Sequence, residues 1–448
     1  MISDRGDRIG VIGFFFARLL LVALLLPLTL VWREPAFADF RYPLFAGLLV
    51  LPAAVAAAEL TIFLKWGAKL PHARALSLAV LALAFVDVIS TLTVEVRFRW
   101  IRSQVLLAEP DELAILGQHI IVGFRSRPEL QELIARRAVA GVFLTSRNVQ
   151  DLDSSGVAAA IAMLQNMRHQ QGLPVLWIAT DQEGGSVSRL SPPLTRLPFL
   201  SEIVARHPDP KERAAVVRQL AHTQGRELAE IGVNLNFAPV IDLNHGLINP
   251  NDHYTRVYQR AIAADPHIVL EVAGDYCAAL MDTGVRCTLK HFPGLGRVFE
   301  DTHKGSADLT TPASELAATD WVPFRALMDR NAFIMLGHVR LTSIDPDRPA
   351  SISTAVVSDL LRRDWDYHGA LITDDFGMAA IYHGRDGIER AAVEALNAGV
   401  DMILVSFDPD QYYAVMHALL DAYHDGRLRK DTLQESARRL AFIQAGNS

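Results

Sequence analysis

Cysteine is scarce in this chain of 448 residues, which contains only Cys277 and Cys287. Because Cys277 falls in a predicted helix and Cys287 in a predicted strand, we expect two buried free thiols rather than a disulfide. The pair therefore leaves the redox compartment open. An excess of basic residues is also lacking. The formal net charge is −7, so no nucleic-acid partner is expected.

Charged residues are sparse in the first hundred positions, where three long apolar runs follow one another. Half of the chain's residues are hydrophobic and the mean hydropathy is +0.19, which is high for a soluble protein. Each run is long enough to cross a bilayer as a helix. We therefore expect residues 1–103 to form a membrane region with about three transmembrane helices, over residues 9–32, 43–64 and 75–94.

Three ionisable residues interrupt these runs: Arg18, Glu59 and Asp87. Arg18 and Glu59 can reach the interface or face a neighbouring helix. Asp87 lies near the middle of its run, and carboxylates inside membranes are often functional. A helix–helix contact, or a run that is really two shorter helices, is the simpler explanation of Asp87.

A signal peptide is the alternative interpretation of the first run, with cleavage in the Ala-Phe-Ala of residues 36–38. Arg33 and Glu34 beside that site favour a retained anchor instead. Lys and Arg are distributed equally between the two sides that three spans would separate, so the charges do not orient the protein.

From residue 104 onward, short apolar runs alternate with amphipathic segments, which predicts parallel strands buried on both faces and separated by helices. Eight such repeats favour a (β/α)8 TIM-type barrel over residues 104–448. A doubly wound α/β sheet is the alternative, but no Gly-rich nucleotide fingerprint follows the first strand. The expected strands are residues 119–124, 140–145, 174–180, 233–243, 285–292, 332–339, 370–375 and 401–407, and the clearest helices are 128–140, 154–169, 211–231 and 388–399.

Ionisable residues stand at the ends of five consecutive predicted strands. In barrels of this kind the chemistry lies at the carboxyl ends of the strands, so these side chains should share one mouth. A single Asp after a strand is usually a cap or a turn residue, but five in register indicate a functional site. The residues are Asp181, Asp242, Lys290 with His291, His338, and Asp374 with Asp375.

Several reactions can be tested against this set. A metal cluster could use His291, His303, His338, Asp301 and Asp374. However, the first strand lacks the His-x-His that metal-dependent barrels of the amidohydrolase type offer, and no phosphate-cradling loop is present for phosphoryl transfer. Glycoside hydrolysis fits better, because it needs one fixed carboxylate and one proton donor on either side of a sugar.

Motifs in the right order resemble the exo-β-N-acetylglucosaminidase branch of glycoside hydrolase family 3. They are DQEGGSVSRL (181–190), KHFPGLG (290–296), DTH (301–303), GHV (337–339), RPASIS (348–353), LITDDFGM (371–378) and AAVEALNAGVDMILV (391–405). The resemblance covers roughly residues 115–448. It implies a retaining mechanism on a single barrel domain, without a metal or organic cofactor.

The resemblance also implies roles for single residues. Asp374 resembles the nucleophile that forms the covalent glycosyl-enzyme, and Asp375 is its rival. His303 resembles the general acid/base and Asp301 the residue that orients it. A histidine suits this role because its pKa lies near neutrality.

The sugar would be held by Asp181, Arg189, Lys290, His291 and Arg260, by the same resemblance. Arg256 is an alternative to Arg260, because the motif around Arg260 matches weakly. Glu183 is tempting as an acid, but its two following glycines indicate a structural turn and the family does not use it catalytically.

Three departures from the family put substrate preference in doubt. Leu295 stands where the family usually has His, Ser186 stands where it usually has Arg, and residues 249–259 do not align cleanly. The membrane spans are also unlike the soluble members.

These observations predict a membrane-anchored, retaining β-N-acetylhexosaminidase acting on a carbohydrate partner such as a peptidoglycan fragment. The expected place is the bacterial cytoplasmic membrane, with a preference for an outward-facing barrel because that substrate lies outside. One alternative is a family 3 enzyme for another sugar such as glucose, although those usually carry further domains after the barrel. The other is a non-catalytic membrane sugar sensor, in which Asp87 would carry a signal. The sequence leaves the oligomeric state open.

Overall fold

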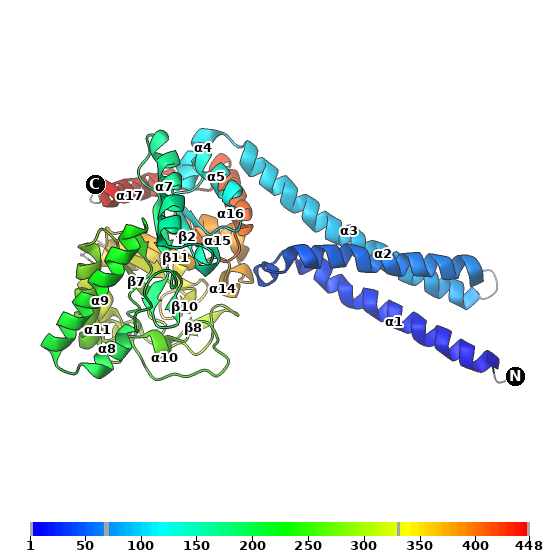
Figure 1. The fold of residues 1–448 in the computed structure, drawn as a ribbon, viewed down its shortest axis with the longest axis horizontal. Coiled ribbons are helices and arrows are strands. Elements are labelled where there is room, and N and C mark those ends of the chain that lie inside the picture. The colour runs from blue at the N-terminus through cyan, green and yellow to red at the C-terminus, as the bar shows by residue number, and fades with distance from the viewer. Residues whose placement is uncertain (1–2, 67–70, 329–331, 446–448) are drawn as a thin grey trace. The chain divides into compact units, whose positions relative to one another are not determined.

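A computed structural model describes residues 3–66, 71–328 and 332–445 of the chain (Figure 1). The chain divides into two compact units, Met1–Leu106 and Leu107–Ser448.

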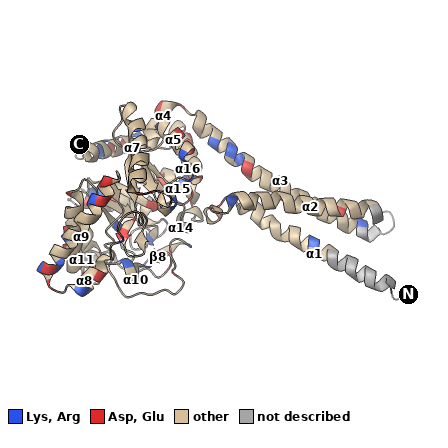
Figure 2. Cartoon of the chain, viewed as in Figure 1, with Lys and Arg blue, Asp and Glu red and all other residues tan. Residues whose placement is uncertain are grey.

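The first unit consists of long apolar helices. They are α1 (Ser3–Val31), α2 (Arg41–Trp66) and α3 (Pro71–Leu107), with a short 3-10 helix, η1 (Pro35–Phe37), between the first two. Two segments, Arg41–Leu64 and Arg74–Leu107, are long and apolar enough to cross a membrane, and the apolar part of α1 among the residues searched, Phe15–Val31, is shorter. Figure 2 shows few charged residues on the described parts of these helices.

The three ionisable residues that interrupt the apolar runs are buried or largely buried in this unit. Arg18 of α1 pairs with Glu59 of α2 at 2.5 Å (Nε to Oε1), so these two residues face each other. Asp87 is fully buried on α3, and its carboxylate oxygens accept no hydrogen bond from any residue that the structure describes. Because α3 is one continuous helix, the idea of two shorter helices around Asp87 is wrong.

The second unit contains an eight-stranded parallel sheet rolled into a nearly closed barrel. Its neighbour order is β6-β3-β2-β1-β12-β11-β9-β7. Isolated parallel bridges join Leu235 to Arg286 and Val240 to Lys290, and so connect the two end strands. The strands are β1 (Ile120–Val122), β2 (Gly141–Leu144), β3 (Trp177–Thr180), β6 (Leu235–Asn236), β7 (Thr288–Phe292), β9 (Phe333–Leu336), β11 (Leu371–Asp375) and β12 (Met402–Val405). Each falls within one of the eight predicted runs, which confirms the barrel.

Helices surround the barrel, and four of them match the predicted amphipathic segments. The matches are α5 (Arg127–Ala135), α7 (Ser154–Gln170), α9 (Pro210–Glu230) and α15 (Gly387–Ala398). The others include α4 (Pro110–Gly117), α8 (Leu200–Arg206), α10 (Val257–Arg260), α11 (Pro266–Met281), α12 (Ala313–Ala318), α13 (Trp321–Leu327), the π-helix η3 (Ala355–Asp364) and α16 (Gln411–His424). Asp-Pro pairs begin α9 and α11, because the Asp side chain caps free backbone N–H groups and Pro needs none at the first position.

Large side chains fill the barrel interior. Phe143 stacks on Phe237 at 5.6 Å between ring centroids, and Trp177 meets Phe333 edge-on at 5.1 Å. The last helix, α17 (Lys430–Ala445), covers the amino-terminal end of the strands, where Arg439 pairs with Asp401 just before β12. The interior is therefore a packed core, and the carboxyl-terminal end of the strands is available for a functional site.

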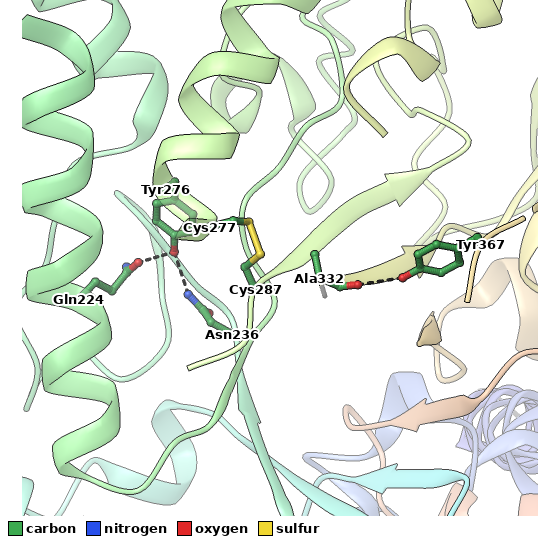
Figure 3. The surroundings of a disulfide bond; sticks show 7 residues. All are labelled: Gln224, Asn236, Tyr276, Cys277, Cys287, Ala332 and Tyr367. Carbon is green, nitrogen blue, oxygen red and sulfur yellow. Dashed lines mark hydrogen bonds between the residues drawn. A yellow bond between two sulfur atoms is a disulfide. The ribbon is translucent and has the colours of Figure 1, made fainter. Parts of the chain in front are cut away.

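Cys277 and Cys287 form a disulfide between α11 and the start of β7 (Figure 3), so the expectation of free thiols is wrong. Their Cα atoms are 5.5 Å apart because α11 turns back through Gly284 and packs alongside the strand that follows it. Only ten positions separate the two residues, but the sequence alone does not reveal that a helix and a strand bring them together.

Candidate active site

Asp374 and Asp375 end strand β11 and have different surroundings. The carboxylate of Asp375 accepts hydrogen bonds from the backbone N–H groups of Gly377 (2.6 Å), Ser406 (2.7 Å) and Phe407 (2.9 Å), and from the Ser406 hydroxyl. Asp374 accepts one, from the N–H of Asp375 at 2.8 Å. Asp375 is thus tied to the loop after β12, whereas Asp374 keeps lone pairs for a ligand.

The pKa values of the two carboxyl groups are shifted in opposite directions. Burial raises the pKa of Asp375. Burial also opposes ionisation of Asp374, but its electrostatic interactions with His291, His338 and His303 outweigh burial and lower the pKa of Asp374. Asp374 is therefore held as a carboxylate among three histidines, as a nucleophile requires.

A buried ionic cluster lies across the ends of β3 and β7. Lys290 Nζ contacts Asp181 Oδ1 at 2.8 Å and Glu183 Oε1 at 2.7 Å. Arg260 forms a two-pronged pair with Glu183, at 2.8 Å from Nε and 2.5 Å from Nη2. The two cations and two carboxylates balance, which is how buried charges are tolerated. Burial works against the charge on Lys290, but Asp181 and Glu183 raise its pKa.

Glu183 is the centre of this cluster, although the glycines that follow it predicted only a turn. The turn is present: Gly184 has φ of 114°, and a Cβ there would lie 2.4 Å from the carbonyl oxygen of Pro198. Despite burial, Arg260 and Lys290 lower the pKa of Glu183, so it stays ionised. Arg260, rather than Arg256, is the arginine that joins the cluster.

A second layer of hydrogen bonds holds the segment that carries Asp181 and Glu183. Gln182 donates its backbone N–H to Asn236 Oδ1 at 2.9 Å, and its carbonyl oxygen accepts from Gln224 at 2.8 Å. The Tyr276 hydroxyl lies between the Gln224 and Asn236 side chains, next to the disulfide (Figure 3). The arrangement links the ionic cluster to helices α9 and α11.

Asp242 fixes His291. Its Oδ2 lies 2.7 Å from Nδ1 of His291, and its Oδ1 accepts from the backbone N–H of Leu295 at 2.7 Å. The Asp242 carboxylate thus sets both the ring of His291 and the turn after β7. Asp242 was expected at the mouth, but its pairing with His291 was not.

Asp301 and His303 form a dyad on the loop after β7. Asp301 Oδ1 lies 3.0 Å from Nδ1 of His303 and 3.0 Å from its backbone N. Partial burial opposes ionisation of Asp301, but its hydrogen bonds to His303 and the charge of that ring lower its pKa to about 2. The His303 side chain is 37% exposed, and the Tyr254 ring lies beside it at 5.3 Å. An exposed imidazole oriented by a carboxylate suits proton transfer.

Arg189 is the one predicted site residue that the structure leaves outside these contacts. Its backbone N–H donates to the Asp181 carbonyl at 3.1 Å, and its side chain is exposed.

The sequence also allows metal ligation by some of these residues. Within the described ranges, no three His, Cys, Asp or Glu side chains are arranged to hold a metal ion. His338 instead contacts the Ser351 hydroxyl at 2.8 Å and the Asp375 carbonyl at 3.0 Å. Burial lowers its pKa, so the neutral ring serves these two bonds.

The mouth therefore offers an ionised carboxylate, a hydrogen-bonded Asp–His dyad and several fixed hydrogen-bonding groups on one barrel. This combination defines an enzyme of the hydrolase type for a polyhydroxylated substrate. The chain belongs to glycosyl hydrolase family 3, since the model of the family's N-terminal domain matches residues 113–443.

Relatives and solved structures agree. The chain is 35% identical over 302 residues to a beta-hexosaminidase of Alkalilimnicola ehrlichii, covering 67% of this chain and 82% of that protein. It is 32% identical over 355 residues to beta-hexosaminidase LpqI of Mycobacterium tuberculosis, covering 76% and 84%. It resembles the structure of a family 3 beta-N-acetylglucosaminidase from Paenibacillus sp., with a TM-score of 0.68, 31% identity, and coverage of 75% of this chain and 62% of that one.

Proposed function

We propose that this chain is a retaining β-N-acetylhexosaminidase that removes terminal β-linked N-acetylglucosamine. The observation that carries the proposal is the placement of ionised Asp374 among His291, His338 and His303, with His303 bonded to Asp301. A carboxylate nucleophile and a separate proton donor are what a double displacement at a sugar needs. The hexosaminidases among the relatives support the choice of sugar.

The reaction would proceed in two steps. Asp374 attacks the anomeric carbon while Nε2 of His303 gives its proton to the leaving oxygen, so that the glycosidic bond breaks and a glycosyl ester forms. His303, now neutral, takes a proton from water, and the resulting oxygen attacks the same carbon and releases Asp374. Asp301 keeps the other ring nitrogen, Nδ1, in place throughout.

The other site residues would bind the sugar. Lys290, Asp181 and Arg260 share one ionic cluster, in which each side chain is held before a sugar arrives. His291 is fixed by Asp242. Arg189, which is exposed at the same turn, would close on a sugar hydroxyl from the solvent side.

The proposed setting is the bacterial cytoplasmic membrane, with α1, α2 and α3 as three transmembrane helices and peptidoglycan fragments as substrate. The disulfide supports an outward-facing barrel, because disulfides persist on the oxidising side of that membrane. A reporter fused to the C-terminus tests this: alkaline phosphatase activity is expected outside, and a fluorescent fusion that matures only in the cytoplasm would contradict it.

The enzyme proposal is tested on the full-length chain in detergent. We expect release of chromophore from an aryl β-N-acetylglucosaminide, little release from the matching β-glucoside, and loss of both in Asp374→Ala. Proton NMR of the first product should show the β-anomer, as retention demands. Preferred hydrolysis of the glucoside would favour the alternative sugar specificity. A folded chain that binds N-acetylglucosamine without turnover would favour a sensor.

A further inference from the structure

Thr255 lies in residues 249–259, the segment that does not align cleanly with the family, and its hydroxyl reaches the Asp301–His303 dyad. Its Oγ1 is 3.0 Å from Asp301 Oδ1 and 3.3 Å from His303 Nδ1. The side chain is only 6% exposed, so bulk water does not compete for these contacts. The pattern of the sequence gave no reason to select this residue.

The hydrogen bonds to the Asp301 carboxylate are all made by one of its two oxygens, Oδ1, among the residues that the structure describes. Oδ1 receives the backbone N–H of His303 and the Thr255 hydroxyl, and also faces Nδ1 of His303. Oδ2 is buried and has no hydrogen-bond partner among the described residues. A hydroxyl has one proton and two lone pairs. Once it donates to Asp301, Thr255 Oγ1 can only accept from His303, which places the ring proton on Nδ1.

That tautomer matters for the chemistry. With the Nδ1 proton shared between Asp301 and Thr255, Nε2 is the nitrogen that exchanges a proton with the substrate and with water. Two acceptors also restrict the orientation of the His303 ring more than one acceptor would, because a rotation of the ring would break at least one of the two hydrogen bonds. The Thr255 hydroxyl therefore adds a second fixed point to the dyad.

The backbone of Thr255 is held as firmly as its hydroxyl. Its carbonyl accepts from Nη1 of Arg260 at 2.7 Å, and Arg260 is bonded to Glu183 in the ionic cluster. The Asp252 side chain shapes the turn by accepting from the N–H groups of Tyr254 (3.2 Å) and Arg256 (2.7 Å). Thr255 thus joins the sugar-binding cluster to the dyad.

Two further contacts bind the same segment to the dyad loop. Asn249 Nδ2 donates to the Phe299 carbonyl at 2.7 Å, before the dyad, and Lys304 Nζ donates to the Asn251 carbonyl at 2.7 Å, directly after it. The loop is therefore attached to this segment on both sides of His303.

We propose that Thr255 is a positioning residue for the Asp301–His303 dyad, setting the tautomer and direction of the His303 ring. The inference rests on the proposed role of His303 as the general acid/base.

The test uses two aryl β-N-acetylglucosaminides, one with phenol and one with dinitrophenol as leaving group. Phenol needs a proton from the acid as it departs, whereas dinitrophenol does not. General acid catalysis is worth roughly 10²–10⁴-fold, so a misplaced acid in Thr255→Val should lower the phenyl-to-dinitrophenyl ratio of kcat/KM about tenfold. Thr255→Ser keeps the hydroxyl and should restore the ratio.

Thr302→Val is the matched control. The Thr302 hydroxyl is also buried and in the dyad loop, but it has no hydrogen-bond partner among the described residues, so the ratio should not change. An equal loss on both glycosides in Thr255→Val, or no rescue by Ser, would overturn the positioning role. His303→Ala separates the two hypotheses: if it leaves the ratio unchanged, the acid/base assignment itself fails.

Discussion

Asp374 and Asp375 are neighbours, but their substitution should have opposite effects on stability and activity. In Asp375→Ala, the backbone N–H groups of Gly377, Ser406 and Phe407 lose their acceptor. Each buried N–H left without a partner costs about 1–3 kcal/mol. Burial raises the pKa of Asp375, which means that its carboxylate is unfavourable to bury, and removal of this carboxylate offsets part of the cost.

We therefore expect Asp375→Ala to lower the free energy of unfolding by about 3 kcal/mol, and the thermal unfolding midpoint by roughly 4 °C for a domain of this size. Asp374→Ala removes an acceptor of only one hydrogen bond and should change stability by less than about 1 kcal/mol. Its kcat should fall at least about 10³-fold, because removal of a nucleophile leaves only binding effects.

Thermal unfolding followed by circular dichroism and hydrolysis of the aryl glycoside at saturating substrate measure both quantities on the same preparations. The refuting result is the reverse pattern: a stable, inactive Asp375→Ala together with a destabilised, active Asp374→Ala. That outcome would exchange the roles of the two residues.

Three further predictions concern the barrel. Glu183→Gln leaves the charges of Arg260 and Lys290 underpaired, so the free energy of unfolding should fall by about 3 kcal/mol, measured by thermal unfolding; an unchanged midpoint would mean that the cluster does not stabilise the fold. Cys277→Ser opens a disulfide with a sequence separation of 10, which should cost about 2–3 kcal/mol, and added reductant should then have no further effect on the midpoint. Burial lowers the pKa of His119 in the folded protein, so the unfolded state binds a proton at a higher pH than the folded state does. The free energy of unfolding should therefore fall as the pH drops below about 6.5, by up to about 1.4 kcal/mol per pH unit. His119→Gln should reduce this slope in denaturant titrations.

The sequence was sufficient to predict the eight strands and the residues at their ends. Apolar runs such as the one that becomes β12 are buried on both faces, and polar residues follow them where the core stops. The partners of the site residues were harder to predict. Asp242 lies 49 positions from His291, and Thr255 lies 46 from Asp301. Such pairs follow from barrel closure and loop packing, which local patterns do not encode. Cys277 and Cys287 were missed for the same reason.

The helices of the first unit, Met1–Leu106, show the same limit. Length and hydropathy predict apolar helices, and Arg41–Leu64 and Arg74–Leu107 meet those criteria. The pairing of Arg18 with Glu59 could not be assigned beforehand, because either residue could equally have faced the interface. Helix spacing along the chain does not fix which faces meet.

The proposed nucleophile, Asp374, and the proposed acid/base, His303, lie on parts of the barrel that are positioned in different ways. Asp374 ends β11, which is paired with a strand on either side, so its position follows from the whole sheet. His303 depends on a loop and on one facing segment, residues 249–260, outside the sheet. Apart from Arg260, which belongs to the ionic cluster, sequence changes in that segment would therefore act on the proposed proton donor and leave the strand that carries Asp374 unchanged. In a lineage of such enzymes, the range of aglycones would change by replacing one short segment, with little effect on the folding of the barrel.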